Sequence, residues 1–219
     1  AFGDIYATGI IFPYILAQIM ATPGTNKESD KWNKRYQAKG QTVGTENLSP
    51  AYVLHEFQHL LPVEGLALDL ASGLGANALF LAQHNLQTHA WDISSVAIEK
   101  LNAAAKSLDL NLNTEVRDVV AKPPKENSFD VIVVSHFLDR QIMPDIIAAL
   151  RKNGLLFYQT FTKAYVQESG PTNETFRLGK NELLSLCEDL DVIVYREEGL
   201  IGDTDSGFRN EAIFIGQHN

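Results

Sequence analysis

Short apolar runs alternate with amphipathic stretches along most of the chain after residue 65. The apolar runs predict strands at 66–70, 87–92, 112–117, 129–135 and 154–161. The stretches between or after them predict helices at 76–84, 94–108, 140–151 and 180–189. One run, 131–134, holds no polar residue, which is typical of a parallel strand covered on both faces. The alternation predicts an α/β fold with a doubly wound, mostly parallel sheet and right-handed crossovers.

The C-terminal part departs from this alternation. Apolar runs at 192–195 and 212–215 are joined by a segment rich in Gly, Asp, Ser and Thr that has no helical pattern. Two strands joined without a crossover helix are expected to pair antiparallel. Upstream of them, residues 162–179 form a long polar loop. Long loops are unusual in a compact domain, so this one is interpreted as an active-site lid.

Two helices are expected before the first strand. Residues 30–39 predict a helix that carries Trp32, Arg35 and Tyr36 on one face, because these residues are three to four positions apart. A second helix begins at Ser49-Pro50, with a capping serine and a proline at the first helical position. It is expected to run to about residue 61.

Residues 1–29 are interpreted as an apolar N-terminal arm, and residues 30–219 as one domain whose N-terminal helices occupy 30–61. Gly9, Pro13 and Gln18 interrupt the apolar stretch, which makes it too short for a membrane-spanning helix. No basic start precedes it, so a signal peptide is not favoured. The arm is expected to pack on its own domain or to form a homodimer contact, rather than to attach to a membrane.

Composition narrows the possible partners. The formal net charge of −9 does not favour binding to nucleic acid phosphates, which takes Lys and Arg. A single cysteine, Cys187, cannot form an internal disulfide, so a cytoplasmic location is expected. Cys187 lies in an apolar run, which favours a core position over a nucleophile.

A glycine turn after the first strand is the most informative motif. Gly73 and Gly75 connect strand 66–70 to a helix, and a turn without Cβ atoms lets the backbone approach a ligand. Asp69 stands near the end of the strand, and Asp92 ends the next strand nineteen positions after Gly73. This spacing suits a carboxylate that accepts hydrogen bonds from ribose hydroxyls, so a nucleoside-containing cofactor is predicted.

Two cofactor classes fit the turn. The segment 73–78 matches the dinucleotide fingerprint with alanine last, which keeps a nicotinamide oxidoreductase open. However, Asp69 places a negative charge beside the turn, where it would repel a pyrophosphate and attract the ammonium group of an amino acid. The antiparallel strand pair at the C-terminus also differs from the sheet expected of a dinucleotide-binding domain.

Taken together, Asp69-x-Ala71-x-Gly73-x-Gly75, Asp92, Asp118 and 129–132 resemble the motifs of class I S-adenosylmethionine-dependent methyltransferases. Residues 32–36, 135–140, 158–162 and 168–176 are most similar to the small tellurite-resistance-type methyltransferases. The resemblance implies a Rossmann-like, seven-stranded sheet with an antiparallel C-terminal strand. It also implies S-adenosylmethionine as cofactor and a small-molecule acceptor, such as a thiol or a chalcogen oxyanion. Ala71 stands where the family usually has glycine.

The resemblance also implies roles for individual residues. Asp69, Ala71 and the Gly73–Gly75 turn with Asn77 would flank the methionine end of the cofactor, and Arg35 would pair with its carboxylate. Asp92 with Ile93 would bind the ribose, and Asp118 with Val119 the adenine. Ser135 and His136 would line the sulfonium, with His136 as the candidate general base.

Each role has a structural alternative. Asp92 can cap the following helix, Asp118 can close a turn, and His136 can be a hydrogen-bonded core histidine. Trp32 and Tyr36 face either the cofactor or the core. A non-catalytic cofactor-binding module also stays open, because of Ala71 and the N-terminal arm.

The string His55-Glu56-Phe57-Gln58-His59 matches the zinc-metalloprotease motif, with two imidazoles on one helix face. No downstream third ligand is evident, and the rest of the chain has another architecture. We therefore interpret the string as a coincidence on a surface helix and predict no metal site.

Overall fold

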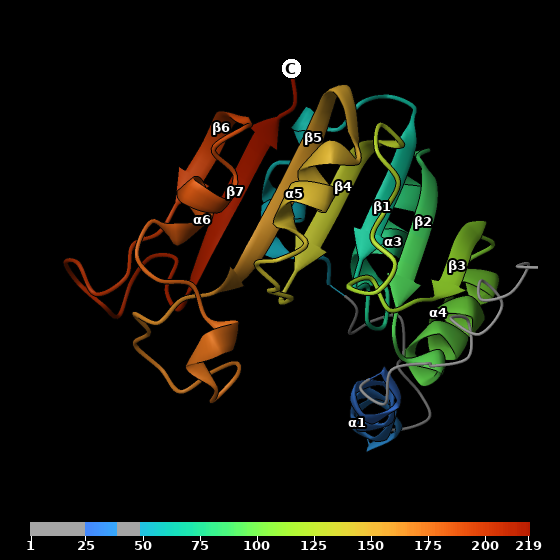
Figure 1. Cartoon of the computed structure of the whole chain (residues 1–219), viewed down its shortest axis with the longest axis horizontal. Helices are drawn as coiled ribbons and strands as arrows, with labels where there is room; N and C mark the ends of the chain where they lie inside the picture. The colour runs from blue at the N-terminus through green and yellow to red at the C-terminus, as the bar shows by residue number, and fades with distance from the viewer. Residues whose placement is uncertain (1–24, 39–48) are drawn as a thin grey trace, which may run out of the picture.

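The computed structural model describes residues 25–38 and 49–219. Residues 1–24 of the expected arm (1–29), with the expected homodimer contact, lie outside the described residues, whereas residues 25–29 belong to the first helix. Figure 1 shows one twisted sheet with helices on both of its faces. The seven strands follow the order β3-β2-β1-β4-β5-β7-β6.

The first five strands are parallel, as the alternation predicts. They are β1 (Leu66–Leu70), β2 (Gln87–Asp92), β3 (Leu112–Val116), β4 (Phe129–Ser135) and β5 (Leu150–Phe161). The last two are β6 (Asp191–Arg196) and β7 (Glu211–Gln217). β7 lies between β5 and β6 and runs antiparallel to both. The predicted fold class, including the antiparallel C-terminal strand, is confirmed.

Helices cover the sheet in two layers. On one face, α5 (Met143–Ala148) and α6 (Glu182–Leu186) pack on the alternate residues of β1, β4, β5 and β7 that include Leu70, Ile132 and Tyr158. On the other face, α2 (Tyr52–Glu56) and α3 (Ala76–Gln83) pack on the intervening residues, which include Val133 and Phe157. Because β4 contributes to both cores, residues 131–134 are fully buried.

Several helix bounds differ from the prediction. The helix expected from residue 50 to about 61 is α2, which ends at Glu56 and is followed by a 3-10 turn, η2 (Gln58–Leu60). The helix expected at 140–151 is only α5, because Pro144 fits its first turn and residues 150–151 already belong to β5. The helix expected at 180–189 is limited to α6, after Asn181 in a left-handed conformation.

The N-terminal helix α1 (Thr25–Ala38) begins earlier than the expected residue 30 and docks beside α4 (Ser95–Ser107). The Asn33 side chain accepts hydrogen bonds from the Ser94 hydroxyl at 2.6 Å and from the backbone N–H of Val96 at 3.3 Å. The Lys100 ammonium donates to the Tyr36 carbonyl at 2.6 Å. These contacts place the Tyr36 end of α1 over the ends of the first strands. Among the described helices, none has the length and apolar character needed to cross a membrane.

Candidate active site

The predicted site residues gather at the carboxyl ends of the parallel strands. Asp69, Asp92 and Ser135 stand at or next to the last residue of β1, β2 and β4, which are neighbours in the sheet. Figure 1 shows that α1 and the segment around η3 (Glu174–Phe176) lie beyond this edge, on opposite sides of it. This is the edge where open α/β sheets bind their ligands.

The turn after β1 has a left-handed backbone at three positions: Ala71 (φ 56°), Gly73 (φ 55°) and Gly75 (φ 79°). A Cβ at Gly73 would lie 2.7 Å from the Tyr36 hydroxyl oxygen, so this glycine allows α1 to approach. A Cβ at Gly75 would overlap Leu101 of α4. Gly75 therefore also allows α4 to pack against the turn. Ala71, in contrast, adopts a left-handed conformation that costs an alanine about 1–2 kcal/mol.

Asp92 joins the turn to the next helix. One carboxylate oxygen accepts the Gly73 N–H at 2.7 Å and the other accepts the Ser94 N–H at 2.8 Å. The Ser94 hydroxyl caps α4 by accepting from Ala97 N at 3.2 Å, so the cap does not need the carboxylate of Asp92. Burial raises the pKa of Asp92, although its two backbone hydrogen bonds oppose this. Each oxygen keeps a lone pair for a further donor such as a ribose hydroxyl.

Asp69 is the most deeply buried carboxyl of the site, at 1% exposure. It accepts hydrogen bonds from Asn77 Nδ2 at 3.3 Å and from the Ala78 N–H at 3.0 Å. Burial raises its pKa to about 7, and the bonds from Asn77 and Ala78 offset only part of this effect. Asn77 also donates to the Ser135 hydroxyl at 2.9 Å and accepts from Ala51 N at 2.8 Å. Asn77 thus ties together β1, β4 and the start of α2.

Among the buried side-chain nitrogen and oxygen atoms of the described residues, one is left without a partner: the Ser72 hydroxyl, in the middle of the glycine turn. Buried hydroxyl groups are nearly always hydrogen-bonded, so an unpaired one marks a place where a polar ligand group fits. Together with the lone pairs of Asp92 and the left-handed turn, this atom fits the amino-acid and ribose parts of S-adenosylmethionine.

The aromatic residues of α1 stack on each other, and Tyr36 reaches the glycine turn at Gly73. Trp32 and Tyr36 stack with ring centroids 5.9 Å apart, and the Arg35 guanidinium lies 5.2 Å from the Trp32 ring. Burial and the nearby Asp92 carboxylate raise the pKa of Tyr36 well above its ordinary value. Tyr36 is therefore a neutral hydroxyl beside Gly73 and Asp92. Arg35 is exposed, and its pairing with the methionine carboxylate stays a prediction.

The predicted adenine residues follow β3. Asp118 accepts hydrogen bonds from Val120 N at 3.0 Å and Ala121 N at 3.2 Å, so it does close a turn. Val119 is buried against the core. Contact of these residues, and of Ile93 after β2, with the cofactor stays a prediction.

The structure adds a residue that the sequence did not reveal. His136 Nε2 lies 3.0 Å from Glu211 Oε1, at the start of β7. The other Glu211 oxygen accepts from Gln159 at 2.6 Å, and Gln159 in turn accepts the Val53 N–H at 2.8 Å. The bond from His136 lowers the pKa of Glu211, against the opposing effect of burial. His136 is therefore not a core histidine: its side chain is 42% exposed.

The long loop after β5 is folded around a buried arginine. Arg177 donates from Nε to the Pro171 carbonyl at 2.8 Å, from Nη1 to the Thr162 carbonyl at 2.9 Å and from Nη2 to the Ser169 carbonyl. Its guanidinium also lies 4.3 Å from the Tyr165 ring and 5.6 Å from the Phe161 ring. Residues 162–179 are thus an ordered cap beside His136, and their closure as a lid stays a prediction.

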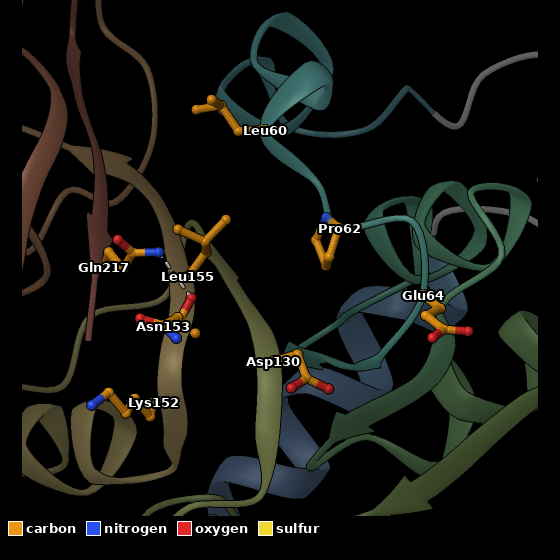
Figure 2. Close-up of a pocket in the computed structure, with 9 residues that line it drawn as sticks. Leu60, Pro62, Glu64, Asp130, Lys152, Asn153, Leu155 and Gln217 are labelled. Carbon is orange, nitrogen blue, oxygen red and sulfur yellow. Dashed lines mark hydrogen bonds between the residues drawn. The ribbon is translucent and has the colours of Figure 1, made fainter. Parts of the chain in front are cut away.

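A cavity of about 320 Å³ lies at the opposite edge of the sheet, at the amino ends of β1 and β4. Figure 2 shows its lining, which includes Asp130, Lys152 and Gln217. Asp130 accepts hydrogen bonds from Leu66 N at 2.7 Å and from Arg151 at 2.8 Å, so it is structural, as expected. None of the predicted site residues lines this cavity, and we assign it no role in the chemistry.

The zinc-protease string does not form the helix that its motif requires. α2 ends at Glu56, and His59 belongs to η2, so the two imidazoles do not share one helix face. His55 lies against Phe80 and His59 against Phe57, with centroid distances of 6.2 Å in both pairs. Within residues 25–38 and 49–219, no group of three or more His, Cys, Asp or Glu side chains is placed to hold a metal ion.

Comparison with known proteins agrees with this geometry. Residues 67–154 match the family model of a methyltransferase domain. The chain is 30% identical over 136 residues to the probable S-adenosyl-L-methionine-dependent methyltransferase TehB of Haemophilus influenzae. The aligned segment covers 59% of this chain and 47% of TehB. The chain therefore spans about half the length of the curated relatives that it matches.

Solved structures show the same fold. The crystal structure of TehB from H. influenzae superposes with a TM-score of 0.61 and 22% identity over 88% of this chain and 67% of that one. The [4+2]-cyclase SpnF superposes with a TM-score of 0.58 and 15% identity over 73% of this chain and 76% of that one. The second likeness shows that this fold also hosts other chemistry.

Proposed function

We propose, on the premise that this chain belongs to the class I S-adenosylmethionine-dependent methyltransferases, that it transfers the methyl group of S-adenosylmethionine to a small-molecule acceptor. The observation that carries this proposal is the buried carboxylate of Asp92, which bonds the Gly73 turn with one oxygen and Ser94 with the other, and keeps lone pairs for ribose hydroxyls. The similarity to a methyltransferase domain and to TehB supports S-adenosylmethionine over the nicotinamide cofactor that the turn alone leaves open.

The cofactor supplies a methyl carbon activated by the positive charge of its sulfur, so the protein provides position, alignment and exclusion of water. Asp92 with Ile93 binds the ribose, and Asp118 with Val119 borders the adenine. Asp69, Asn77 and the 71–75 turn flank the methionine part. Ser135 and His136 lie beside the reacting sulfur, and Tyr36 covers the turn from α1.

The acceptor is proposed to be a soft nucleophile, either a thiol or a chalcogen oxyanion. This rests on the similarity to TehB and to the tellurite-resistance-type segments. Phe161 packs against His136 at 4.9 Å between ring centroids and supplies an apolar wall to the acceptor side. Tyr165 and Phe176 are 43% and 47% exposed and extend this wall onto the loop. A cytoplasmic location and the absence of nucleic-acid partners stay predictions from composition.

Calorimetric titration tests the cofactor assignment. We expect S-adenosylmethionine and S-adenosylhomocysteine to bind and NAD not to bind. Asp92→Ala should remove most of this affinity, because it deletes both the ribose acceptor and the bond that holds the Gly73 turn. Asp189→Asn, an exposed change in the turn that follows α6, serves as the control. Preferential binding of NAD, or unchanged affinity in Asp92→Ala, would refute the assignment.

A second candidate is a module that binds the cofactor without methyl transfer. It is favoured by the left-handed Ala71 at a position where the family usually has glycine, and by the occurrence of this fold in a cyclase. Cofactor binding without transfer to any thiol, selenium or tellurium acceptor would support this candidate over the enzyme.

A further inference from the structure

His136 is held in one orientation by three independent contacts. Its backbone is left-handed, at φ 54°, and its N–H donates to the Gln159 carbonyl at 2.8 Å. Its ring lies on Phe161, at 4.9 Å between centroids and 35° between planes. Its Nε2 bonds Glu211 at 3.0 Å. A strained backbone at a residue that is also fixed through its side chain is typical of functional sites.

Glu211 is itself fixed and charged. Its second oxygen accepts from Gln159, which is 5% exposed and anchored to the backbone of α2 through Val53. The pKa of Glu211 lies below its ordinary value, so the carboxylate is ionised at neutral pH and can only accept hydrogen bonds. The proton of the neutral His136 ring must then sit on Nε2. This leaves Nδ1 as the basic nitrogen, and no described residue hydrogen-bonds to it.

The charges around His136 disfavour an anionic acceptor. Glu211 brings a negative charge to the ring, and the two arginines that hold the 162–179 loop are engaged elsewhere. Arg177 directs its N–H groups to three backbone carbonyls. Arg140 bonds both Glu182 oxygens and the Thr175 and Arg177 carbonyls. An oxyanion beside His136 would face a carboxylate with no guanidinium from this pair to balance it.

We infer that Glu211 positions His136 as a general base, and that the acceptor is a neutral small molecule whose nucleophilic atom carries a proton, such as a thiol or a hydroxyl. This inference rests on the proposed function: of its two acceptor classes it keeps the thiol and excludes the oxyanion, and it adds the hydroxyl, which likewise carries a proton on its nucleophilic atom. The acceptor proton moves to His136 Nδ1, and the electron pair left behind forms the bond to the methyl carbon. The pair of the broken sulfur–methyl bond stays on sulfur, and the imidazolium later releases its proton to water.

The arrangement is the familiar one of a base oriented by a carboxylate on its far nitrogen. Glu211 here is a positioning residue, because it acts only through the imidazole. Glu211 on β7 bonds the ring, and the Arg177 guanidinium lies 5.6 Å from the centroid of Phe161, on which the ring packs. Removing Glu211 should therefore change the tautomer and the rate, but not cofactor binding.

The first test uses the cofactor-free protein. In ¹⁵N-histidine-labelled protein, His136 is identified among the six histidines by its loss in His136→Asn. We expect its proton on Nε2 in the wild type and a mixture of tautomers in Glu211→Gln. Glu188→Gln, an exposed change on the far side of the sheet, should leave the spectrum unchanged. A wild-type proton on Nδ1 would overturn the inference, whether or not the protein proves to be a methyltransferase.

The second test compares acceptors. We expect His136→Asn to slow methyl transfer to neutral thiols and alcohols by about 10²–10⁴-fold in kcat. The loss should fall below about tenfold for acidic thiols that are already ionised in solution, since these need no base. Glu211→Gln should show the same pattern at smaller size, and His59→Asn none. Calorimetric affinity for S-adenosylhomocysteine should stay unchanged in Glu211→Gln, because Glu211 acts only through the imidazole.

Equal losses on neutral and ionised acceptors would assign these residues a structural role and overturn the inference. Methylation of a chalcogen oxyanion at full rate by His136→Asn would overturn it as well. Both results are distinct from a failure of the proposed function, which would appear as absent cofactor binding by the wild type.

Discussion

The buried carboxyl of Asp69 predicts that cofactor affinity depends on pH near neutrality. Burial raises its pKa from 3.8 to about 7 in the free protein. S-adenosylmethionine carries a positive sulfonium and an ammonium, and these favour the ionised carboxylate. Binding should therefore be strong above pH 7 and weaken as pH falls through 7, because the cofactor must first displace the proton of Asp69.

The size of this effect follows from linkage. For a group with a pKa of about 7 that must be ionised to bind, the dissociation constant rises about fivefold from pH 7 to pH 6 and about fifty-fold to pH 5. The dissociation constant keeps rising as pH falls until pH reaches the lower pKa that Asp69 has in the complex with the cofactor. The same shift makes Asp69 lower the free energy of unfolding as pH rises from about 4 to 7, since the folded state holds the proton longer.

Calorimetric titration of S-adenosylmethionine at pH 5, 6 and 7 measures the effect. Asp69→Asn should bind more weakly than the wild type at pH 7 and lose most of the pH dependence. The exposed variant Asp189→Asn should keep it. Asp92 also has a raised pKa, so a small residual slope is expected in Asp69→Asn. A wild-type affinity that is flat from pH 5 to 7, or a full slope in Asp69→Asn, would refute this reasoning.

Four further substitutions, one of them used only in combination, test the turn and the loop. Ala71→Gly relieves the strain of a left-handed alanine, and this gain exceeds the entropy cost of a glycine in the unfolded chain. The free energy of urea unfolding should therefore rise by about 0.5–1 kcal/mol. A fall would mean that the Ala71 methyl packs favourably. Gly75→Ala should lower the unfolding free energy by about 2–3 kcal/mol, because of its φ of 79° and its overlap with Leu101. The double variant Gly75→Ala/Leu101→Ala should lose less than the sum of the two single variants, since the smaller residue 101 removes the overlap. Strict additivity of the unfolding free energies would contradict the overlap. Arg177→Met leaves three backbone carbonyls without their donor, so limited proteolysis should cut within 162–179 and the unfolding free energy should fall by about 3 kcal/mol; unchanged protease resistance would show that the loop does not depend on Arg177.

The fold could be predicted because the buried strands are continuous apolar runs in the sequence. A run such as 131–134, fully buried between two layers of helices, leaves few options other than a central parallel strand. Short helices gave less information. The pattern from residue 50 to 61 continued past Glu56, but the backbone leaves the α-helix at Phe57, where no glycine or proline announces it.

The geometry of the candidate site was predictable where a motif is local. Gly73 follows β1 and Asp92 ends the adjacent strand β2, so the sequence spacing directly indicates that they meet. Glu211 was not predictable, because it is 75 positions from His136 and meets it only through the insertion of β7 next to β5. Arg177 is a similar case: a charged residue in a polar loop gives no sign that it is buried at 4% exposure.

Transfer of an isotopically labelled methyl group tests the central claim most directly. The wild-type protein is incubated with methyl-¹³C S-adenosylmethionine and a panel of small thiols, alcohols and chalcogen oxyanions, and products are followed by NMR and mass spectrometry. We predict a labelled methyl group on at least one neutral thiol or hydroxyl acceptor, with one S-adenosylhomocysteine formed per methyl and none in Asp92→Ala. Binding of the cofactor with no labelled product from any acceptor would contradict the account.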